Sequence, residues 1–364
     1  MFDFVRKILA DPLLRYDKIS EYNIHHDNFK QEIDVRLIDE DTENVLRGTR
    51  VVELELLTGT YAGQVGQVPT HFSPLMQVDV DEGDVVSVRV GQVTEARFNV
   101  LIHNHERTPL LLGAVVVFFL ALSLIGGKQG VKAILGLVFT LVSIVFLLIP
   151  LLIRGYDAIA VTIVILSVIT VVGLLLLGGF TKKTVVAIIG CISGVIFAAI
   201  LATLVGALAS ISGFNMDEAE ALLPIAMDTN LRIRGLFISG ILIASLGAVM
   251  DTAMTIASAT EEVVMASSKV TSKQLFKSSM NVGRDAMGTM SNTLILAFIG
   301  TGLNMMIMIF AYGVTFNQLM NTDLIAIEII RSLSGSLGIV LTVPIVAYVA
   351  SRMMMTKPVR KRKN

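Results

Sequence analysis

The sequence predicts an all-α polytopic membrane bundle of about seven transmembrane helices, preceded by a small N-terminal β-rich soluble domain. Of its 364 residues, 54% are hydrophobic and only 16% are charged, and the mean hydropathy is +0.74. Soluble domains carry about 25% charged residues, so this composition argues against a purely soluble protein. Seven apolar runs are long enough to cross about 30 Å of hydrocarbon. In lipid they must be helical, because the backbone has to satisfy its own hydrogen bonds. The runs are 109–125, 131–153, 157–177, 184–209, 235–256, 292–312 and 333–352.

Charge divides the chain into an acidic front and a basic remainder. Residues 1–108 hold 11 Lys/Arg against 19 Asp/Glu, a net charge of −8, whereas the rest of the chain holds 18 against 11, a net charge of +7. A nucleic-acid binder concentrates its basic residues on a polar domain. Here the basic residues lie mostly between apolar runs, so we expect no nucleic-acid partner.

The cysteine count and the absence of catalytic motifs narrow the chemistry. Cys191 is the single cysteine, which excludes a disulfide framework and a Cys-rich metal site. The sequence contains no zincin helix, nucleophile elbow or Gly-rich phosphate loop. His103, His105 and Glu106 could hold a metal weakly, but they lack further ligands, which favours a solvated linker. We therefore expect no enzyme activity, no cofactor and no metal.

The polar front of the chain has the pattern of short strands. Residues 1–30 mix charged and apolar positions, and they contain no run suited to a signal peptide or anchor. Within 31–105, apolar residues alternate with polar ones at 33–37, 52–56 and 86–90, a period typical of strands with one buried face. Glycine and proline clusters between these stretches indicate turns. The pattern predicts a small barrel- or sandwich-like β domain.

Basic residues between the apolar runs set the predicted orientation of the membrane domain, 109–352. Positive residues favour the cytoplasmic side, which places the basic tail, 353–364, in the cytoplasm. Counting back through the spans puts the segments 257–291, 178–183 and 126–130 on the same side, and each of them carries lysine. Seven spans then place the N-terminal domain outside the membrane, although no signal anchor is visible before it.

Small residues recur at helical spacing in two of the apolar runs. Gly190, Gly194 and Ala198 lie four residues apart in one run, and Gly240 and Ala244 have the same spacing in the next. Small side chains let helix backbones approach closely in a membrane. The pattern favours helix packing over a substrate groove.

The candidate site is a group of polar residues in and beside the apolar runs. Asp251 lies within a run, where an ionisable group costs at least about 2.5–3.5 kcal/mol and normally has a partner. Arg284 and Asp285 are expected at the same depth, near the cytoplasmic face, with Asn292 and Thr293 just inside the next span. We expect Arg284 to pair with Asp251. The group fits a proton or cation site, an anion clamp or a gate, and it equally fits a network that only fixes two helices.

Two further charged groups have simpler explanations. Lys269, Lys273 and Lys277 recur every four residues and are expected to lie along anionic headgroups. Glu328 and Arg331 are three residues apart on a helix, where they can form an intrahelical ion pair. The pair is enough to explain both residues, although an ion-pathway role stays open.

Four motifs resemble the pattern of a bacterial family. At Gly247-Ala-Val-Met-Asp251, Gly283-Arg-Asp285, Gly288-Thr-Met-Ser-Asn-Thr-Leu-Ile-Leu-Ala297 and Gly335-Ser-Leu-Gly-Ile-Val-Leu-Thr-Val-Pro344 the chain is similar to the YibE/F family of membrane proteins. The resemblance implies a multi-span protein of bacterial cytoplasmic membranes and implies no activity. The family pattern usually has a hydrophobic segment before the polar domain, and its absence in this sequence leaves the side of residues 1–108 open.

Two functional hypotheses follow. The first is a permease-like protein for a small solute or ion, with Asp251, Arg284, Asp285 and Asn292 lining the cytoplasmic half of a pathway. The alternative is a membrane-anchored interaction protein that displays the β-rich domain to a partner. Both make the lipid bilayer the principal partner, and both leave open whether the protein forms oligomers.

Overall fold

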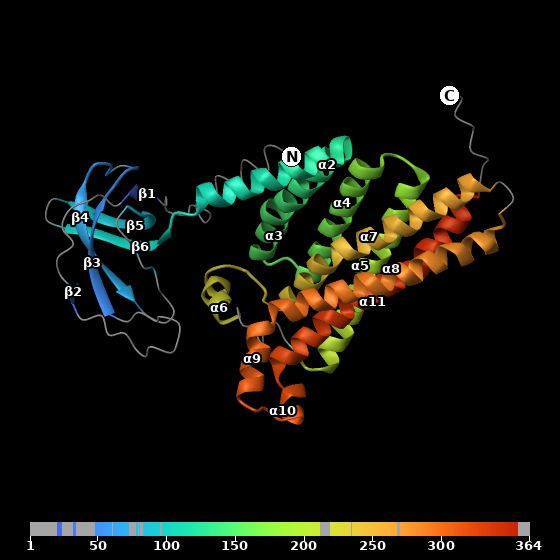
Figure 1. The fold of residues 1–364 in the computed structure, drawn as a ribbon. Coiled ribbons are helices and arrows are strands. Elements are labelled where there is room, and N and C mark those ends of the chain that lie inside the picture. The colour runs from blue at the N-terminus through green and yellow to red at the C-terminus, as the bar shows by residue number, and fades with distance from the viewer. Residues whose placement is uncertain are drawn as a thin grey trace. The chain divides into compact units, whose positions relative to one another are not determined.

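The computed structural model contains two compact units, residues 1–121 and residues 122–364 (Figure 1). The predicted segments 1–30 and 353–364 lie largely outside the described residues. The structure describes residues 20–23, 32–33, 48–59, 61–72, 78, 80, 83–94, 97–211, 219–233, 235–267 and 270–355.

The first unit is built from antiparallel strands. Their order is β2-β3-β1-β5-β6, and β4 pairs with β3 in a register that runs from Gly48 opposite Phe72 to Glu55 opposite Val65. β1 lies within the segment 1–30, where the sequence predicted no strand. The described pairings do not define a closed barrel or a two-layer sandwich, so that shape stays a prediction. The strands are β1 (Ser20–Asn23), β2 (Glu32–Ile33), β3 (Gly48–Glu55), β4 (Val65–Phe72), β5 (Val85–Thr94) and β6 (Arg97–His105).

Alternating apolar residues form the core of this unit. Leu54, Val68, Val86 and Val88 are fully buried, because residues two apart on a strand share one face. The turn after β3 depends on Gly63, which has a φ of 86° and donates its backbone N–H to the Leu56 carbonyl at 2.6 Å. Positive φ is a conformation that glycine adopts without a steric penalty. The predicted alternation at 52–56 and 86–88 therefore corresponds to a real buried face.

Helices make up the rest of the described chain. Several begin at the capping residues that the sequence supplies: the Asp157 side chain accepts the N–H of Ala160, and Thr271 forms a capping box with Gln274. Such caps satisfy backbone donors that have no partner in the first turn. The elements are α2 (Thr108–Ser143), η2 (Ile144–Leu148), α3 (Ile149–Ile153), α4 (Ala158–Gly178), α5 (Lys182–Leu208), α6 (Ala219–Asp228), α7 (Leu236–Ala266), α8 (Ser272–Thr301), α9 (Leu303–Ala311), α10 (Phe316–Met320) and α11 (Asp323–Met353).

The described helices provide five candidate membrane spans, or six if α8 and α9 form one span bent by 61°. Seven separate spans, as the sequence predicted, are not seen. The runs predicted at 109–125 and 131–153 fall in one continuous stretch of 46 residues, Thr108–Ile153. Within this stretch Gly127 has a non-helical backbone, with a φ of 52°. Two helices therefore meet at a kink at Gly127, within the turn that the sequence predicted at 126–130.

The predicted loop at 257–291 is almost entirely helical. α7 continues to Ala266 and α8 begins at Ser272, so only a short connection separates them. The sequence suggested a loop because α8 is much less apolar than the other spans. Its 30 residues include Lys273, Lys277 and Arg284, which broke the apolar run on which the prediction depended.

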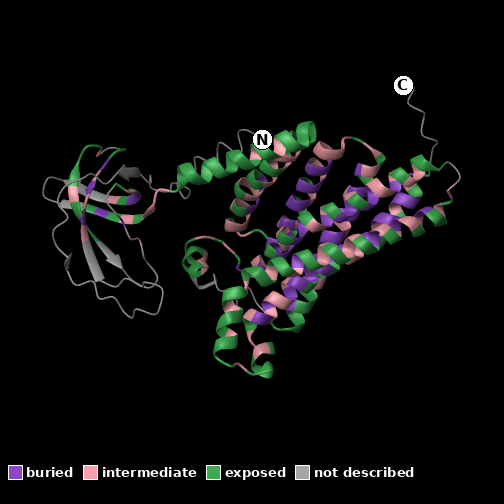
Figure 2. Cartoon of the chain, viewed as in Figure 1, coloured by how far each residue is buried: buried purple, intermediate pink, exposed green. Residues whose placement is uncertain are grey.

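α5, α7 and α11 form the centre of the helical unit, with α8 and α4 packed against them. Their facing sides are buried (Figure 2). α5 and α11 approach closely: a Cβ added at Gly190 would overlap Val346, and one added at Gly194 would overlap the Thr342 hydroxyl. Ala198, one turn further along, is fully buried against Gly338. Small residues bring these two helices together.

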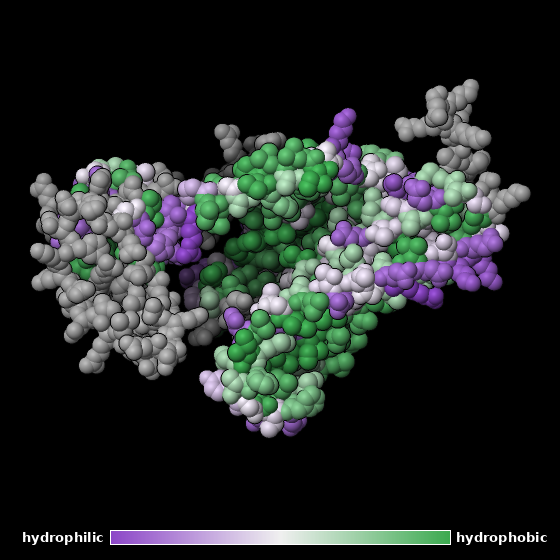
Figure 3. Space-filling model, in the orientation of Figure 1, coloured by the Kyte–Doolittle hydropathy of each residue, from purple (hydrophilic) through white to green (hydrophobic). Residues whose placement is uncertain are grey.

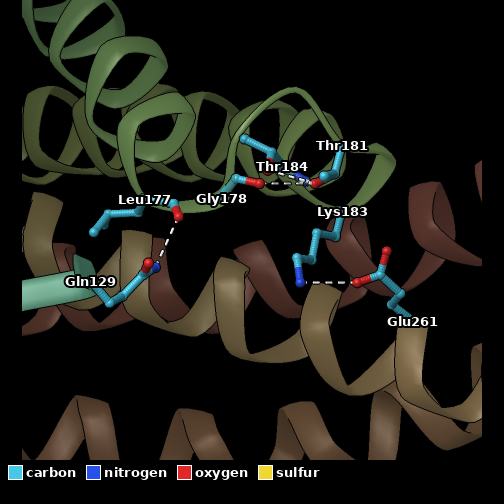
Figure 4. A network of polar contacts seen from close by, with 7 residues as sticks. All are labelled: Gln129, Leu177, Gly178, Thr181, Lys183, Thr184 and Glu261. Carbon is cyan, nitrogen blue, oxygen red and sulfur yellow. Dashed lines mark hydrogen bonds and ion pairs between the residues drawn. The ribbon is translucent and has the colours of Figure 1, made fainter. Parts of the chain in front are cut away.

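A network of polar contacts marks one end of the bundle (Figure 4). The Gln129 side chain donates to the Leu177 carbonyl at 2.8 Å, and Thr181 and Thr184 hydrogen-bond to each other at 2.8 Å. Lys183 forms an ion pair with Glu261 at 3.0 Å. The same end includes Lys182, whose ammonium donates to the backbone carbonyl of Met353. The structure therefore brings together the turns near 129 and 180, the end of α7 and the end of α11, which are the segments that the sequence predicted on one side of the membrane.

The close α5–α11 contact leads to a prediction about stability. We expect Gly194→Val to lower the free energy of unfolding by about 1–3 kcal/mol, because the added methyl groups overlap Thr342 in a packed interface. Gly240→Val is the matched control: it makes the same change in helix propensity at a position where a Cβ meets nothing within 4 Å. Thermal unfolding of the detergent-solubilised protein measures both. Equal midpoints for the two variants would contradict the importance of the contact.

Candidate functional site

The height of the candidate residues in the bundle follows from contacts with α11. Gly194 lies close to the middle of the 27-residue α5 and contacts Thr342, while Gly283 of α8 contacts the next residue, Val343. Gly194 and Gly283 are therefore at the same height. That height is about 16 Å along the α5 axis from Lys183 at the end of the bundle, which is about half the thickness of a hydrocarbon core.

Arg284 and Asp285 follow Gly283 directly and so lie at mid-height of the bundle. The expectation that they lie near the cytoplasmic face of a membrane stays a prediction. Both side chains are exposed on the helix, and neither forms an ion pair with any residue that the structure describes. They do not pair with each other, since adjacent residues on a helix point in different directions. Two opposite charges thus lie at the middle of the bundle with no partner inside the described chain.

Arg284 and Asp285 belong to a continuous polar face of α8. The opposite side of the helix is buried at Leu275, Gly283 and Leu294. In Figure 3 the surface along α8 is white and purple, whereas that over α9 is green. We call this exposed surface the α8 polar face; it consists of Asn281, Arg284, Asp285, Gly288, Thr289 and Asn292.

Thr293 is exposed at the edge of this face. Its hydroxyl donates to the backbone carbonyl of Thr289 at 2.9 Å, which is a local hydrogen bond within α8. The side chain amide of Asn292 is exposed on the face itself. The structure thus collects four of the five predicted site residues on one helix.

Asp251 lies at the midpoint of the 31-residue α7 and is exposed. Val249, two residues earlier, lies beside Gly194, so Asp251 is also within about 3 Å of mid-height. From Gly240 to Thr255 the other exposed residues on its side of α7 are small or hydroxylated, and a Cβ added at Gly240 or Gly247 meets nothing within 4 Å. We call this surface the α7 small-residue face; it consists of Gly240, Ala244, Gly247, Asp251 and Thr255.

The expected ion pair between Asp251 and Arg284 is not formed. α7 and α8 meet where Ile256 approaches Gly283 and where Thr260 and Ser279 share a hydrogen bond of 2.7 Å. Asp251 is five residues before Ile256, which places it about 140° around α7 from that contact. The two residues share a height but lie on opposite sides of the α7–α8 pair. The sequence predicted a common height for the two residues, whereas the direction of each side chain depends on which helices pack together.

The predicted packing residues fall into two sets. Gly190, Gly194 and Ala198 lie at the contact between α5 and α11. Gly240 and Ala244 lie on the exposed α7 small-residue face. For this second pair, packing stays a prediction that needs a partner beyond the described helices.

A cavity near the other end of the bundle was missed by the sequence analysis. It has a volume of about 280 Å³ and lies between the end of α8, α9 and the start of α11, with Phe298 and Met305 in its wall. Glu328 also lines it and forms the predicted ion pair with Arg331 at 2.9 Å. The second carboxylate oxygen, Oε2, is buried without a hydrogen-bond partner. The three-residue spacing of Glu328 and Arg331 predicted the ion pair, whereas the cavity depends on the bend between α8 and α9.

The described residues contain no cluster of three or more His, Cys, Asp or Glu side chains suited to a metal ion. His105, one of the weak metal candidates, has its Nδ1 3.9 Å from an Asp84 carboxylate oxygen. Two groups do not complete a site for a metal such as zinc, which takes four ligands in structural sites.

The long apolar helices indicate a multi-span membrane protein. The profile of the YibE/F-like protein family matches residues 114–356, and the chain belongs to this family. The match begins within α2 and covers most of the helical unit, so the strands β1 to β6 lie outside it. No curated protein and no solved structure matches the chain.

The Glu328–Arg331 pair provides a test of the electrostatics at the cavity. We expect Arg331→Met to lower the free energy of unfolding by about 1–3 kcal/mol, because it leaves the largely buried Glu328 carboxylate without its cation. Adding Glu328→Gln should recover part of the loss, since the side chain is then neutral. A double-mutant cycle on thermal unfolding measures the coupling. Strictly additive effects would show that the pair contributes nothing.

Proposed function

We propose that the protein is a permease-like membrane protein for a small solute or ion, with Asp251 as the residue that meets the transported species. The observation that carries the proposal is the position of Asp251: a carboxylate at mid-height of the bundle, exposed on the α7 small-residue face. A charge at the bilayer centre is expensive and marks a water-filled path or a partner. A path fits this face because its side chains leave space.

The chemistry of the α7 small-residue face favours a cation or a proton. Its single charge is negative, and the Thr255 hydroxyl lies one helical turn away and can supply a second oxygen. Gly240, Ala244 and Gly247 add no bulk along the same side of the helix. A carboxylate at low dielectric interacts more strongly with a cation than it would in water. The face therefore supports recognition by charge, with little shape selection.

The proposal includes a seven-span topology. The stretch Thr108–Ile153 would be about 69 Å long as one straight helix, more than twice the hydrocarbon thickness, so we divide it into two spans at Gly127. Counting α8 with α9 as one span then gives seven. The end of the bundle that carries Lys182, Lys183 and Lys273 is assigned to the cytoplasm of a bacterial cell. An odd number of spans places the residues before α2 on the opposite side.

The β-rich unit supports a second candidate function, an interaction protein that displays this unit to a partner. It has its own buried core, separate from that of the helices, with Leu54 and Leu56 fully buried. This is the feature expected of a unit that folds by itself. Under this hypothesis Asp251 substitutions are silent, whereas removal of residues 1–105 abolishes function.

Ion flux through the reconstituted protein tests the proposal. The full chain is placed in liposomes, and the movement of H⁺, Na⁺, K⁺ and Mg²⁺ down imposed gradients is measured with enclosed dyes. We expect Asp251→Asn to reduce the flux of the transported ion by about tenfold or more, since it removes a charge interaction worth at least about 1.4 kcal/mol.

Glu262→Gln is the matched control, because Glu262 is exposed on the same side of α7 but near its end. It should leave the flux unchanged. Wild-type flux no greater than that of protein-free liposomes, with Asp251→Asn indistinguishable from it, would contradict the proposal for these ions. Equal losses in Asp251→Asn and Glu262→Gln would show that the effect is not specific to the mid-membrane carboxylate.

A further inference from the structure

The α8 polar face has no large apolar side chain along about three helical turns. Its residues recur every three or four positions from Asn281 to Asn292, so they form one stripe along the helix. Arg284 and Asp285 lie at the middle of this stripe and at the middle of the bundle. Nothing in the described helical unit covers them.

Lipid cannot solvate such a surface. Amide, hydroxyl and charged groups in hydrocarbon need hydrogen-bond partners, and mid-membrane charges pair with one another or face water. Because α8 is packed on α7 and α11 through its other side, it cannot turn the polar stripe inward without breaking those contacts. The partner of the stripe must come from outside the described bundle.

The positions of the charges around α8 make the face complementary to itself. With 100° per residue, Arg284 lies about 40° to one side of Gly288, and Asp285 lies about 60° to the other side. Consider a two-fold axis that runs parallel to the helix and passes in front of Gly288. It places the Arg284 side of each copy next to the Asp285 side of the other copy. Arg284 of one copy then lies beside the partner's Asp285, and by symmetry the same pair forms a second time.

We propose that two copies of this chain associate through the α8 polar face about a two-fold axis along the membrane normal, with Gly288 at the point of closest approach and two Arg284–Asp285 ion pairs between the copies. The absence of a side chain at Gly288 lets the two α8 helices approach closely. Asn281, about 20° from Gly288, lies on the axis, where amide groups of two copies hydrogen-bond to each other as in coiled coils.

A second copy fits this face better than a different protein. Copies of one chain share a membrane orientation, so their α8 helices are parallel and carry Arg284 and Asp285 at matching heights. Two-fold dimers are the commonest symmetric assembly and need a self-complementary surface. A face that carried one sign of charge would repel its own copy. This face instead carries a positive charge on one side of the axis and a negative charge on the other.

The dimer does not depend on ion transport. Asp251 lies on the side of α7 away from α8, so the α7 small-residue face stays free when the α8 polar faces meet. Association can therefore be measured whether or not the protein moves ions, and its failure would leave the role of Asp251 unaffected.

Complementary charge variants test the pairing. Arg284→Asp leaves each copy with two acidic residues at the contact, and Asp285→Arg leaves each copy with two basic residues. We expect either variant alone to associate roughly tenfold more weakly than the wild type, because like charges then face each other at both positions. When the two variants are co-expressed with different fluorescent labels, the mixed pair restores both ion pairs and should associate as the wild type does.

Energy transfer between labelled copies in liposomes, at a series of protein-to-lipid ratios, measures the association. Wild-type association equal to that of an unrelated monomeric membrane protein would overturn the proposal. So would single variants that associate as well as the wild type, or a mixture that associates no better than the single variants.

Cross-linking tests the geometry and remains informative if the charge variants fold poorly. In a Cys191→Ala background, Gly288→Cys should form an oxidant-induced disulfide between copies in native membranes. Gly247→Cys is the matched control, since Gly247 is also an exposed mid-helix glycine with open space around it. Cross-linking at both positions equally, only at Gly247→Cys, or at neither would overturn the assignment of the contact to α8.

Discussion

The close packing of α5 against α11 is the contact around which the helical unit is organised. Gly190 and Gly194 on one helix and Gly338 on the other leave no room for a Cβ at the contact. In a membrane, apolar surface gives no hydrophobic drive between helices, so packing and hydrogen bonds must hold the bundle together. α7 and α8 then build on this pair, and their buried sides are set by where α5 and α11 lie. Once those sides are set, the remaining residues of α7 and α8 face outward.

The outward faces explain why ionisable groups lie at mid-height without partners among the described residues. The core is filled by small and apolar side chains and by hydroxyl groups that bond to backbone carbonyls, such as Thr252 and Thr342. None of the buried side chains that the structure describes is an Asp, Glu, Lys or Arg. Asp251, Arg284 and Asp285 therefore occupy the sides of α7 and α8 that face away from the core. This arrangement is costly in lipid, and it makes these faces the places where water or a second copy is needed.

Sequence reasoning predicted that Asp251 and Arg284 share one height in the bundle, but it did not predict the direction of their side chains. Apolar runs predicted α4, α5, α7 and α11 because a span is recognised by its length and hydropathy. α8 was partly predicted as a loop, because its polar face interrupts the apolar run even though its other face is buried. The Asp251–Arg284 pair was expected because both residues belong to neighbouring segments. The pair is absent because Ile256 and Gly283 occupy the contact, and a helix cannot present residues five apart to the same neighbour.

Composition and short-range spacing were enough to establish the class of the protein, the strand alternation in the polar unit and the Glu328–Arg331 pair. Each of these depends on hydropathy or on residues near one another in the chain. Two other relations appear only in the folded chain: the turns near 129 and 180 meet at one end of the bundle, and Asp251 and Arg284 lie on opposite sides of two packed helices. These relations depend on which helix faces touch. That choice is made by contacts between residues far apart in the sequence, where a single missing Cβ determines how closely two backbones approach.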